Sequence, residues 1–256
     1  MESARKPQRL KAPPPWPVDL AALHPAVLAG KTAADIARIP LGRLAVGDVF
    51  TIAVGDVAEL VLEGGSPKFD GVGAGMAAGT LRVEGPVGAF AAAGLRDGRV
   101  EIRGDAGDYL GGALPDGRIG MSGGVVLVRG NAGARAGDRM RRGMLIVESD
   151  AGPAAASRMI AGTVAICGAV GAGPGVLMRR GTLVLGTPPA ALPAGFVPSE
   201  LAADGTFLHL LARFLHTISP RAAACVAAVQ HRALGDLAAL GKGEMLLATT
   251  QAGSRR

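Results

Sequence analysis

Six copies of one short motif, each opened by a glycine, occupy residues 79–186 and constrain the fold of this chain more than any other feature. The opening glycines are Gly79, Gly98, Gly124, Gly143, Gly162 and Gly181. The steps between them are 19, 26, 19, 19 and 19 residues. A fixed period near 20 residues is typical of stacked repeats, which bury their apolar faces only against their neighbours.

The copies align column by column, and the columns alternate between apolar and polar. The second residues after the glycines are Leu81, Val100, Val126, Leu145, Val164 and Leu183. The fourth residues are Val83, Ile102, Val128, Val147, Ile166 and Leu185. The third residues before the glycines are Met76, Leu95, Met121, Met140, Met159 and Met178. Alternation with a period of two predicts a β-strand after each glycine. The methionine column is interpreted as core filling rather than as a cofactor channel.

A repeat of 19 residues is too short to hold a strand, a crossover helix and two loops. It can hold one coil of a right-handed parallel β-helix, an all-β single-stranded solenoid in which each strand pairs with its equivalent one coil along. A leucine-rich repeat is excluded because its Leu-x-x-Leu-x-Leu pattern is missing. The expected organisation is an N-terminal arm and capping segment (1–46), a parallel β-helix (47–186), and a linker with a helical C-terminal cap (187–256).

The N-terminal flank combines prolines with short apolar stretches. Residues 1–17 are predicted to be an extended or disordered arm, because the prolines of 13–17 oppose regular pairing. Thr32 is a predicted N-cap for a short helix that runs through Arg38. Early strands are expected at 49–54 and 60–62.

The C-terminal flank begins with a proline-rich linker at 187–198. Helical spacing of apolar residues predicts one helix over 207–218. Ser219 and Pro220 suit the start of a second helix, expected to run through about Ala233. A short strand is predicted at 241–247, and the whole tail is expected to cap the open end of the β-helix.

Bulk composition restricts the class of partner. The formal net charge is +6, from 27 Lys and Arg against 21 Asp and Glu, which favours an anionic partner. Aromatic residues make up only 3 % of the chain, so an aromatic platform for stacking nucleic-acid bases is missing. The N-terminus lacks the apolar core of a signal peptide and no apolar run reaches transmembrane length. We therefore expect a cytoplasmic protein that binds neither nucleic acid nor membrane.

No group of residues has the spacing of a catalytic or metal centre, so none of either kind is predicted. Cys167 and Cys225 form no C-x-x-C motif, which argues against a disulfide framework, an iron–sulfur site or a cysteine zinc site. Cys167 is interpreted as a small residue within a coil. His209 and His216 are seven residues apart, about 10 Å along a helix, too far to share one metal ion.

Two further motifs are interpreted as turns. Asp105, Asn131 and Asp150 stand in one column before tight Ala-Gly turns, where their side chains are expected to bond the local backbone rather than calcium. The glycine-rich segment Gly71–Gly75 resembles a phosphate-binding loop, but Met76 breaks the GxGxxG spacing and no helical pattern follows. It is predicted to be a corner of the solenoid.

Arginine is the one residue type whose placement indicates binding. Coil stacking would align a stripe of basic side chains suited to holding carboxylates or phosphates bidentately. The candidate ligand-binding residues are Arg139, Arg141, Arg142, Arg158 and Arg179. The alternative, left open by the sequence, is that these residues solubilise the surface or contact partner subunits. The 26-residue step adds a loop within 109–122, where Tyr109 and Arg118 are contact candidates and a functionless insertion is the alternative.

The repeats, with their Gly–strand–Gly-[Asp/Asn]-Ala-Gly pattern preceded by Met-x-x-Gly, resemble the β-helix in the C subunit of formylmethanofuran dehydrogenase. The C-terminal domain of glutamate synthase has similar coils. The flanks Val18–Leu41 (VDLAALHPAVLAGKTAADIARIPL) and 234–245 (LGDLAALGKGEM) resemble those of the dehydrogenase's C subunit and are not shared with glutamate synthase. The resemblance covers nearly the whole chain beyond residue 17.

This resemblance implies a non-catalytic subunit of an enzyme complex. In methylotrophic bacteria the family member belongs to a formyltransferase/hydrolase complex, which transfers a formyl group from tetrahydromethanopterin to a methanofuran-type carrier and hydrolyses it to formate. In methanogens it belongs to a molybdenum or tungsten, iron–sulfur dehydrogenase. The arginine- and alanine-rich composition favours the bacterial complex. The family's catalytic residues lie in the formyltransferase and amidohydrolase-like partner subunits.

The resemblance also implies a ligand. The carrier has a polyglutamylated anionic tail, which would dock transiently on the arginine stripe, and no cofactor bound covalently or through a metal is expected in this chain. Two alternatives stay open: a glutamate synthase-like module that couples partner active sites, and a polysaccharide-cleaving β-helix. The flanks argue against the first, and the missing export signal and aromatic groove argue against the second.

Overall fold

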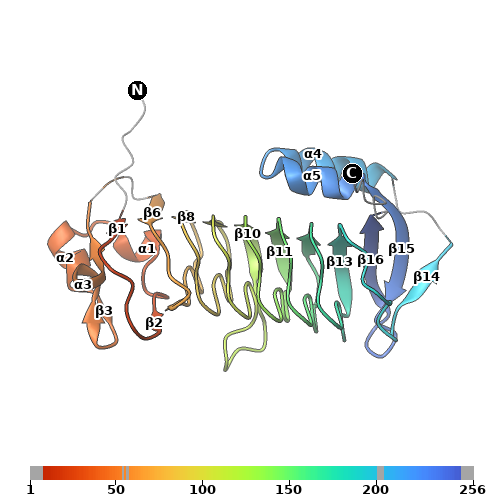
Figure 1. The fold of residues 1–256 in the computed structure, drawn as a ribbon, viewed down its shortest axis with the longest axis horizontal. Coiled ribbons are helices and arrows are strands. Elements are labelled where there is room, and N and C mark those ends of the chain that lie inside the picture. Colours follow the sequence, from red (N-terminus) through yellow and green to blue (C-terminus); the bar gives the residue numbers. More distant parts are fainter. Residues whose placement is uncertain (1–7, 54, 56–57, 201–204, 249–256) are drawn as a thin grey trace, which may run out of the picture.

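The chain is mostly β-structure, dominated by one mixed sheet of 12 strands (Figure 1). The computed structural model describes residues 8–53, 55, 58–200 and 205–248. The strand order in the large sheet is β14-β15-β16-β13-β12-β11-β10-β9-β8-β6-β1-β5. The sheet extends along the long axis of the molecule, with the N-terminal elements at one end and the last strands at the other (Figure 1).

The six predicted strands are confirmed, and each pairs in parallel with its equivalent in the next repeat. They are β8 (Thr80–Val83), β9 (Arg99–Ile102), β10 (Ser122–Val128), β11 (Arg142–Val147), β12 (Thr163–Ile166) and β13 (Arg180–Leu185). The register follows the glycine spacing, as in Leu81↔Val100 and Val164↔Leu183. The seven extra residues of the long step leave this pairing intact, because Val126 still pairs with Val100.

A second line of parallel contacts joins successive repeats away from these strands. Its bridges are Val87↔Ala106, Ala106↔Ala132, Ala132↔Ala151 and Ala151↔Val170. The methionine and leucine column is completely buried, at 0 % exposure in all six repeats, which confirms its interpretation as core. Each repeat therefore contacts its neighbours along two lines, and the repeats share a buried aliphatic core.

The Asx column forms a ladder between repeats, which corrects the expectation of local bonds. Asp105 Oδ1 accepts from the backbone N–H of Asn131 at 2.7 Å, and Asn131 Oδ1 accepts from Asp150 N–H at 3.1 Å. Asp150 Oδ1 accepts from Ala169 N–H at 2.7 Å. Neighbouring strands lie only about 4.8 Å apart, so the amide of the next repeat is within reach of each side chain.

The glycine-rich segment at 71–75 forms turns, as predicted, and leads into β8 rather than a helix. Gly71, Gly73 and Gly75 all have positive φ, between 66° and 69°. This left-handed conformation is disfavoured for residues with a Cβ atom, which accounts for three glycines in five positions.

The N-terminal flank adds strands to the sheet. β1 (Gln8–Leu10) pairs in parallel with β6 (Glu59–Glu63) and antiparallel with β5 (Phe50–Thr51). The prediction of a disordered or extended arm is therefore wrong for residues 8–10, which precede the prolines of 13–17; residues 1–7 lie outside the described part. The early strands are confirmed as β5 and β6, with Val54 outside the described residues.

Short elements fill the rest of this flank. They are β2 (Val18–Asp19), α1 (Pro25–Leu28), α2 (Ala33–Ala37), β3 (Pro40–Leu41), β4 (Leu44–Ala45), α3 (Val46–Val49) and β7 (Phe69–Asp70). The N-cap prediction is confirmed, because Thr32 and Asp35 form a capping box at the start of α2.

The C-terminal flank also contributes strands. β16 (Lys242–Ala248) continues the sheet in parallel with β13, and β15 (Val229–Gly235) and β14 (Val197–Ser199) follow antiparallel. α4 (Gly205–His216) lies two residues earlier than the predicted 207–218, and α5 (Pro220–Ala227) starts at the predicted Ser219 and Pro220. The second helix ends at Ala227 rather than about Ala233, because pairing with β16 draws residues 229–235 into a strand.

The two helices cover the outer face of the sheet, whereas the sequence predicted a helical cap over its open end. Leu211, Leu215 and Val226 form a cluster with residues on that face: Leu127, Ile146, Ala165, Val184 and Leu246. Figure 1 shows α4 and α5 lying across the strands from β10 to β16. Beyond β13 the sheet is continued by β16, β15 and β14.

Candidate functional site: an arginine groove

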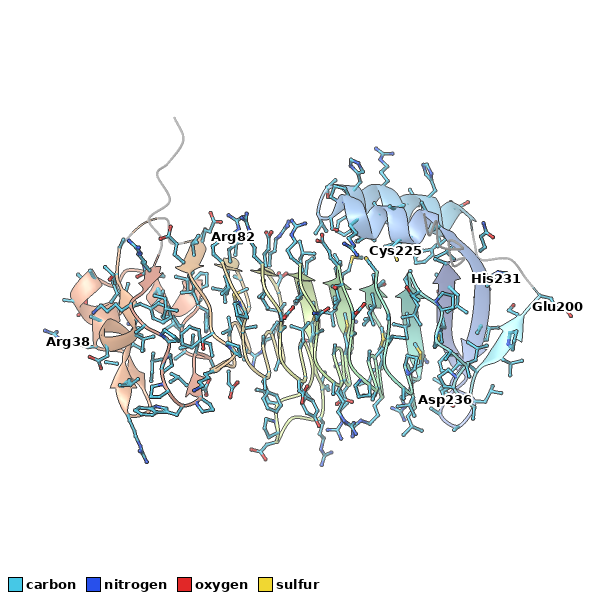
Figure 2. All side chains as sticks on the ribbon, viewed as in Figure 1. Arg38, Arg82, Glu200, Cys225, His231 and Asp236 are labelled. Carbon is cyan, nitrogen blue, oxygen red and sulfur yellow. The ribbon has the colours of Figure 1, made fainter. Side chains whose placement is uncertain are left out.

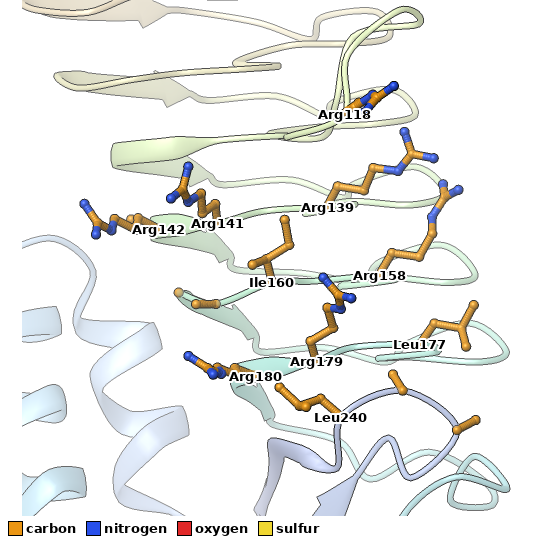
Figure 3. Close-up of a pocket in the computed structure, with 15 residues that line it drawn as sticks. Arg118, Arg139, Arg141, Arg142, Arg158, Ile160, Leu177, Arg179, Arg180 and Leu240 are labelled. Atoms are coloured by element: carbon orange, nitrogen blue, oxygen red, sulfur yellow. The ribbon is translucent and has the colours of Figure 1, made fainter.

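Seven arginines line one cavity of about 1110 Å³, here called the arginine groove (Figure 3). They are Arg118, Arg139, Arg141, Arg142, Arg158, Arg179 and Arg180. Its apolar wall includes Ile160, Leu177 and Leu240. No acidic residue lines the groove within the described parts of the chain.

The repeat stacking brings together all five arginines predicted from the sequence. Arg141 and Arg179 occupy the same position two repeats apart, with Ile160 between them (Figure 3). The backbone N–H groups of Arg141, Ile160 and Arg179 donate to carbonyl oxygens of the preceding repeats at 2.7–2.8 Å. At about 4.8 Å per repeat the two arginine positions are roughly 10 Å apart along the stack. Arg96 occupies the equivalent position in an earlier repeat and does not line the groove.

Arg139 and Arg158 occupy a turn position at which two earlier turns have glycine and a later one has Leu177. Their φ angles are 54° and 53°, and the equivalent Gly75 and Gly94 have 67° and 61°. A side chain in this left-handed region costs roughly 1–2 kcal/mol. Backbone bonds between repeats hold the turn, with Arg158 N–H donating to Val176 O at 2.7 Å. Strain of this kind is common at binding sites.

A single buried carboxylate lies behind these two arginines. Asp138 is 1 % exposed and accepts hydrogen bonds from Arg158 Nε and Nη2, both at 2.9 Å. Ser157 Oγ donates to the same carboxylate at 2.6 Å, and Arg139 Nε lies 3.9 Å from Oδ2. The side chains of Arg141, Arg142 and Arg179 are exposed and form no ion pair or hydrogen bond with the described residues. The groove is therefore strongly positive and holds free guanidinium groups.

The insertion in the second repeat, between Gly98 and Gly124, contributes one wall. Arg118 from this loop lines the groove, and Arg139 Nη1 donates to Gly117 O at 3.0 Å, which ties the loop to the stack. Tyr109, the other contact candidate, lies elsewhere and stacks on Phe90 with ring centroids 5.0 Å apart. Of the two candidates, Arg118 therefore lines the groove and Tyr109 does not.

Sequence reasoning left two parts of the groove out of its candidate set. One is Arg180, whose position directly after Arg179 was the only indication in the sequence that it could line the groove. Ala238, Ala239 and Leu240 come from the connection between β15 and β16, which reaches the groove because β16 pairs with β13. No spacing in the sequence indicates that contact.

The two histidines that the sequence analysis considered as metal ligands lie outside the groove. His209 and His216 are exposed on α4. Among the described residues no three His, Cys, Asp or Glu side chains gather as metal ligands, and none of the helices there could cross a membrane. These observations leave the arginine groove as the main candidate site.

The two cysteines, which the sequence treats separately, meet between α5 and β12. Cys225 lies beneath the helices, facing the strands (Figure 2), with its Sγ 3.9 Å from Ile166 O. A hydrogen bond from Cys167 lowers the pKa of Cys225; burial opposes this effect and Arg221 adds to it. The same hydrogen bond, followed by burial, raises the pKa of Cys167.

The guanidinium array is suited to binding anions. A planar guanidinium matches the geometry of a carboxylate or phosphate and can hold it by two parallel hydrogen bonds. The groove provides several such groups over a length of two repeats, with an apolar strip between them. An extended ligand with more than one negative charge fits this arrangement better than a small single anion.

Comparison with known proteins finds similarity to a curated relative and to a solved structure. No protein-family model matches the chain. The curated relative is the C subunit of the formyltransferase/hydrolase complex Fhc of Methylorubrum extorquens, 40 % identical over 84 residues. That match covers 31 % of this chain and 32 % of the relative, so the chain spans about a third of the curated protein it matches.

The solved structure is the crystal structure of the formyltransferase/hydrolase complex (FhcABCD) from Methylorubrum extorquens in complex with methylofuran. One chain of it is similar with a TM-score of 0.82 and 38 % sequence identity. The similarity covers 95 % of the present chain and 100 % of that chain. Because the identity extends over a whole polypeptide of the complex and the curated match names that component, the protein belongs to the family of the Fhc C subunit.

Proposed function

We propose that this chain is the non-catalytic C subunit of a formyltransferase/hydrolase complex and that its arginine groove docks the anionic tail of a methanofuran-type carrier. The observation that carries the proposal is the groove itself: seven arginines around about 1110 Å³, with no acidic residue in the lining among the residues that the structure describes. The related crystal structure is a complex with methylofuran, which supports a carrier of this type as the ligand.

The charge distribution favours a polyanionic tail over a small anion. Arg141 and Arg142 are separated from Arg179 and Arg180 by one repeat that carries Ile160 and Ala161 instead. Two basic positions about 10 Å apart can be satisfied together only by a ligand with several charges. A polyglutamylated tail has carboxylates along its length and flexible methylene arms that can lie on the apolar strip.

The assembly is part of the same proposal. A formyltransferase subunit and an amidohydrolase-like subunit would supply the catalytic residues, and this chain would hold the carrier between them. The chain would then work in the cytoplasm, without a metal or covalent cofactor of its own.

The architecture proposed for residues 47–186 is a right-handed parallel β-helix, with an N-terminal flank at 1–46 and a C-terminal flank at 187–256. Two lines of parallel pairing, each advancing by one repeat, support it. Parallel crossover connections are almost always right-handed, which favours this hand. A rigid stack of this kind would keep the arginines at fixed spacing.

The proposal is tested by neutralising three groove arginines that have no acidic partner. Arg141, Arg142 and Arg179 are replaced together by Gln, and the control replaces Arg38, Arg43 and Arg213, which lie outside the groove, so both variants lose three charges. Binding of a synthetic oligoglutamate of six residues is measured by calorimetry at several salt concentrations. Each exposed charge pair contributes about 1 kcal/mol at contact, so the groove variant should bind roughly tenfold or more weakly and with a flatter salt dependence.

Equal affinity of the groove variant and the control variant would contradict carrier docking. The assembly is tested separately, by purifying the tagged chain from its native cells and identifying what accompanies it. Formyltransferase and amidohydrolase-like subunits support the proposed complex. Molybdopterin and iron–sulfur subunits would assign the chain to the dehydrogenase instead.

A further inference from the structure

Two buried acidic residues lie against the arginine groove. Asp236 accepts hydrogen bonds from the backbone N–H groups of Leu177 and Ala238 at 2.8 Å each, whereas Asp138 accepts from an arginine side chain. Asp138 is 1 % exposed and accepts three hydrogen bonds: from Ser157 Oγ at 2.6 Å, and from Arg158 Nε and Nη2 at 2.9 Å each. Arg139 Nε and Arg135 Nη1 approach the same carboxylate at 3.9 and 4.0 Å. Burying a carboxylate is unfavourable unless hydrogen bonds and opposite charges compensate for its lost hydration.

The turn itself does not require this carboxylate. In every repeat the equivalent residue donates its N–H to the carbonyl three residues earlier, as Asp138 does to Arg135 O at 3.0 Å. The residues at that position are Ala74, Ala93, Gly112, Asp138, Ser157 and Val176. Five of the six repeats thus form the turn without a charge, so the presence of Asp138 needs another explanation.

The residue that follows Asp138 in the turn explains why a carboxylate is present. Where Asp138 and Ser157 occur, the following residues are Arg139 and Arg158, both held at positive φ. Where Ala74 and Ala93 occur, the following residues are Gly75 and Gly94. The acid and its hydroxyl partner therefore coincide with the two repeats that direct an arginine from this turn into the groove.

We infer that Asp138 is a positioning residue, which with Ser157 fixes the Arg158 guanidinium so that its free edge faces an anionic ligand in the groove. Asp138 takes the Nε–H and one Nη2–H of Arg158. A guanidinium has five N–H groups, so both Nη1–H and the second Nη2–H stay available. One Nη1–H and the second Nη2–H form the end-on edge, which can bind a second carboxylate bidentately.

The inference rests on the proposed function. It predicts that removing the charge of Asp138 weakens the binding of an anionic ligand, whereas net charge alone would predict tighter binding. Asp138→Asn raises the net charge beside the groove by one, which by Coulomb attraction alone would tighten the binding of an anion. Loss of positioning would weaken it, because Arg158 would have to be ordered when the ligand binds. We expect Asp138→Asn to bind the six-residue oligoglutamate about three- to tenfold more weakly than the wild-type chain.

The matched control is Asp116→Asn, an exposed acid of the insertion loop that carries Arg118. It changes the charge equally without touching Arg158, so its affinity should stay unchanged or increase. Arg158→Lys keeps the positive charge but loses the paired N–H donors of the guanidinium, so it should weaken oligoglutamate binding as Asp138→Asn does. Ser157→Ala removes one hydrogen bond and should shift affinity in the same direction by a smaller factor; it also serves if Asp138→Asn does not fold.

A second measurement addresses the position of Arg158 without any ligand. In nitrogen-15 spectra of the wild-type chain, the Arg158 Nε–H signal, assigned from Arg158→Lys, should exchange with water at least tenfold more slowly than that of exposed Arg38. The protection should disappear in Asp138→Asn. Fast exchange in the wild type, or tighter oligoglutamate binding by Asp138→Asn, would overturn the inference.

These outcomes separate the two proposals. A wild-type chain that binds no oligoglutamate refutes the docking function, and the exchange measurement then still decides whether Asp138 fixes Arg158. A groove triple variant that loses affinity while Asp138→Asn gains it leaves carrier docking in place and removes the positioning role.

Discussion

At the residue scale, the turns between repeats show how one backbone conformation serves two purposes. The same left-handed position carries glycine in the early repeats and Arg139, Arg158 and Leu177 in the later ones, with φ between 53° and 59°. Glycine satisfies this conformation without strain, whereas each larger side chain adds a cost that only its contacts can offset. The arginines have such contacts in Asp138 and in the groove.

Leu177 tests this cost, because its side chain is 44 % exposed. Leu177→Gly should raise the free energy of unfolding by about 0.5–1 kcal/mol: relief of roughly 1–2 kcal/mol of strain exceeds the extra entropy of an unfolded glycine. Val176→Gly, at an exposed neighbour with ordinary φ, should lower it. Urea unfolding of both variants gives the comparison, and destabilisation by both would show that the left-handed position carries no strain.

The cysteine pair gives a pH-dependent prediction. Because the Cys167 hydrogen bond lowers the pKa of Cys225, Cys225 forms its thiolate at lower pH than a free thiol, whose pKa is about 8.5. The rate of its alkylation, followed by peptide mass spectrometry, should therefore reach half its maximum below that pH. In Cys167→Ala the midpoint should move upward. A change in the access of the reagent to Cys225 would alter the maximum alkylation rate but not the pH of its midpoint. An unchanged midpoint in Cys167→Ala would therefore contradict the effect of the hydrogen bond on the pKa of Cys225.

At the element scale, the outer face of the sheet decides where the helices lie. The third residue after each opening glycine is charged in the first two repeats, Arg82 and Glu101. It is apolar in the next four: Leu127, Ile146, Ala165 and Val184. The charged part forms ion pairs, including Arg82 to Glu101 at 3.6 Å, and the apolar part is buried under α4 and α5. This change from charged to apolar marks the edge of the helical cover.

Ser219 fastens α5 to the sheet and offers a direct test. Its Oγ accepts from Ala222 N–H at 3.0 Å as the N-cap, and donates to Glu148 Oε1 at 2.5 Å. Ser219→Ala removes the cap and one partner of a buried carboxylate, and should lower the free energy of unfolding by about 1–3 kcal/mol. The control, Thr217→Ala, removes an exposed hydroxyl that bonds only Phe214 O and should cost under about 0.5 kcal/mol. Equal losses in urea unfolding would show that the Glu148 contact is unimportant.

At the scale of the whole molecule, stability comes from contacts between adjacent repeats. Each strand finds its partner one repeat along, so removing one complete repeat should leave every remaining column in register. Deletion of residues 80–98 removes 19 residues and places Arg99 after Gly79, where β9 can pair with β6. We expect this variant to fold, with a β-rich circular dichroism spectrum and one cooperative melting transition.

Deletion of residues 80–89 is the matched control, because it removes about half a repeat. It would set turn residues opposite strand residues and turn apolar columns toward solvent, so this variant should aggregate or stay unfolded. If both deletions fold equally well, or neither folds, pairing by whole repeats does not govern the architecture.

The sequence by itself determined the strands, the buried columns and the alignment of the five candidate arginines. The glycine spacing predicted the positions of β8–β13. Because Arg141 and Arg179 each stand two residues before an opening glycine, the same spacing predicted that they lie on one face. These features could be predicted because every contact they need lies one or two repeats away, where the period fixes which residues meet.

The tertiary structure alone decided the features that join segments without a shared period. Residues 8–10 form a strand, residues 229–235 belong to β15 and not to the predicted second helix, and the two helices pack on the outer face of the sheet. Cys167 met Cys225, and Leu240 reached the groove. The physical reason is the same throughout: the free energy of each arrangement depends on partners distant along the chain, and local spacing and propensity contain no information about them.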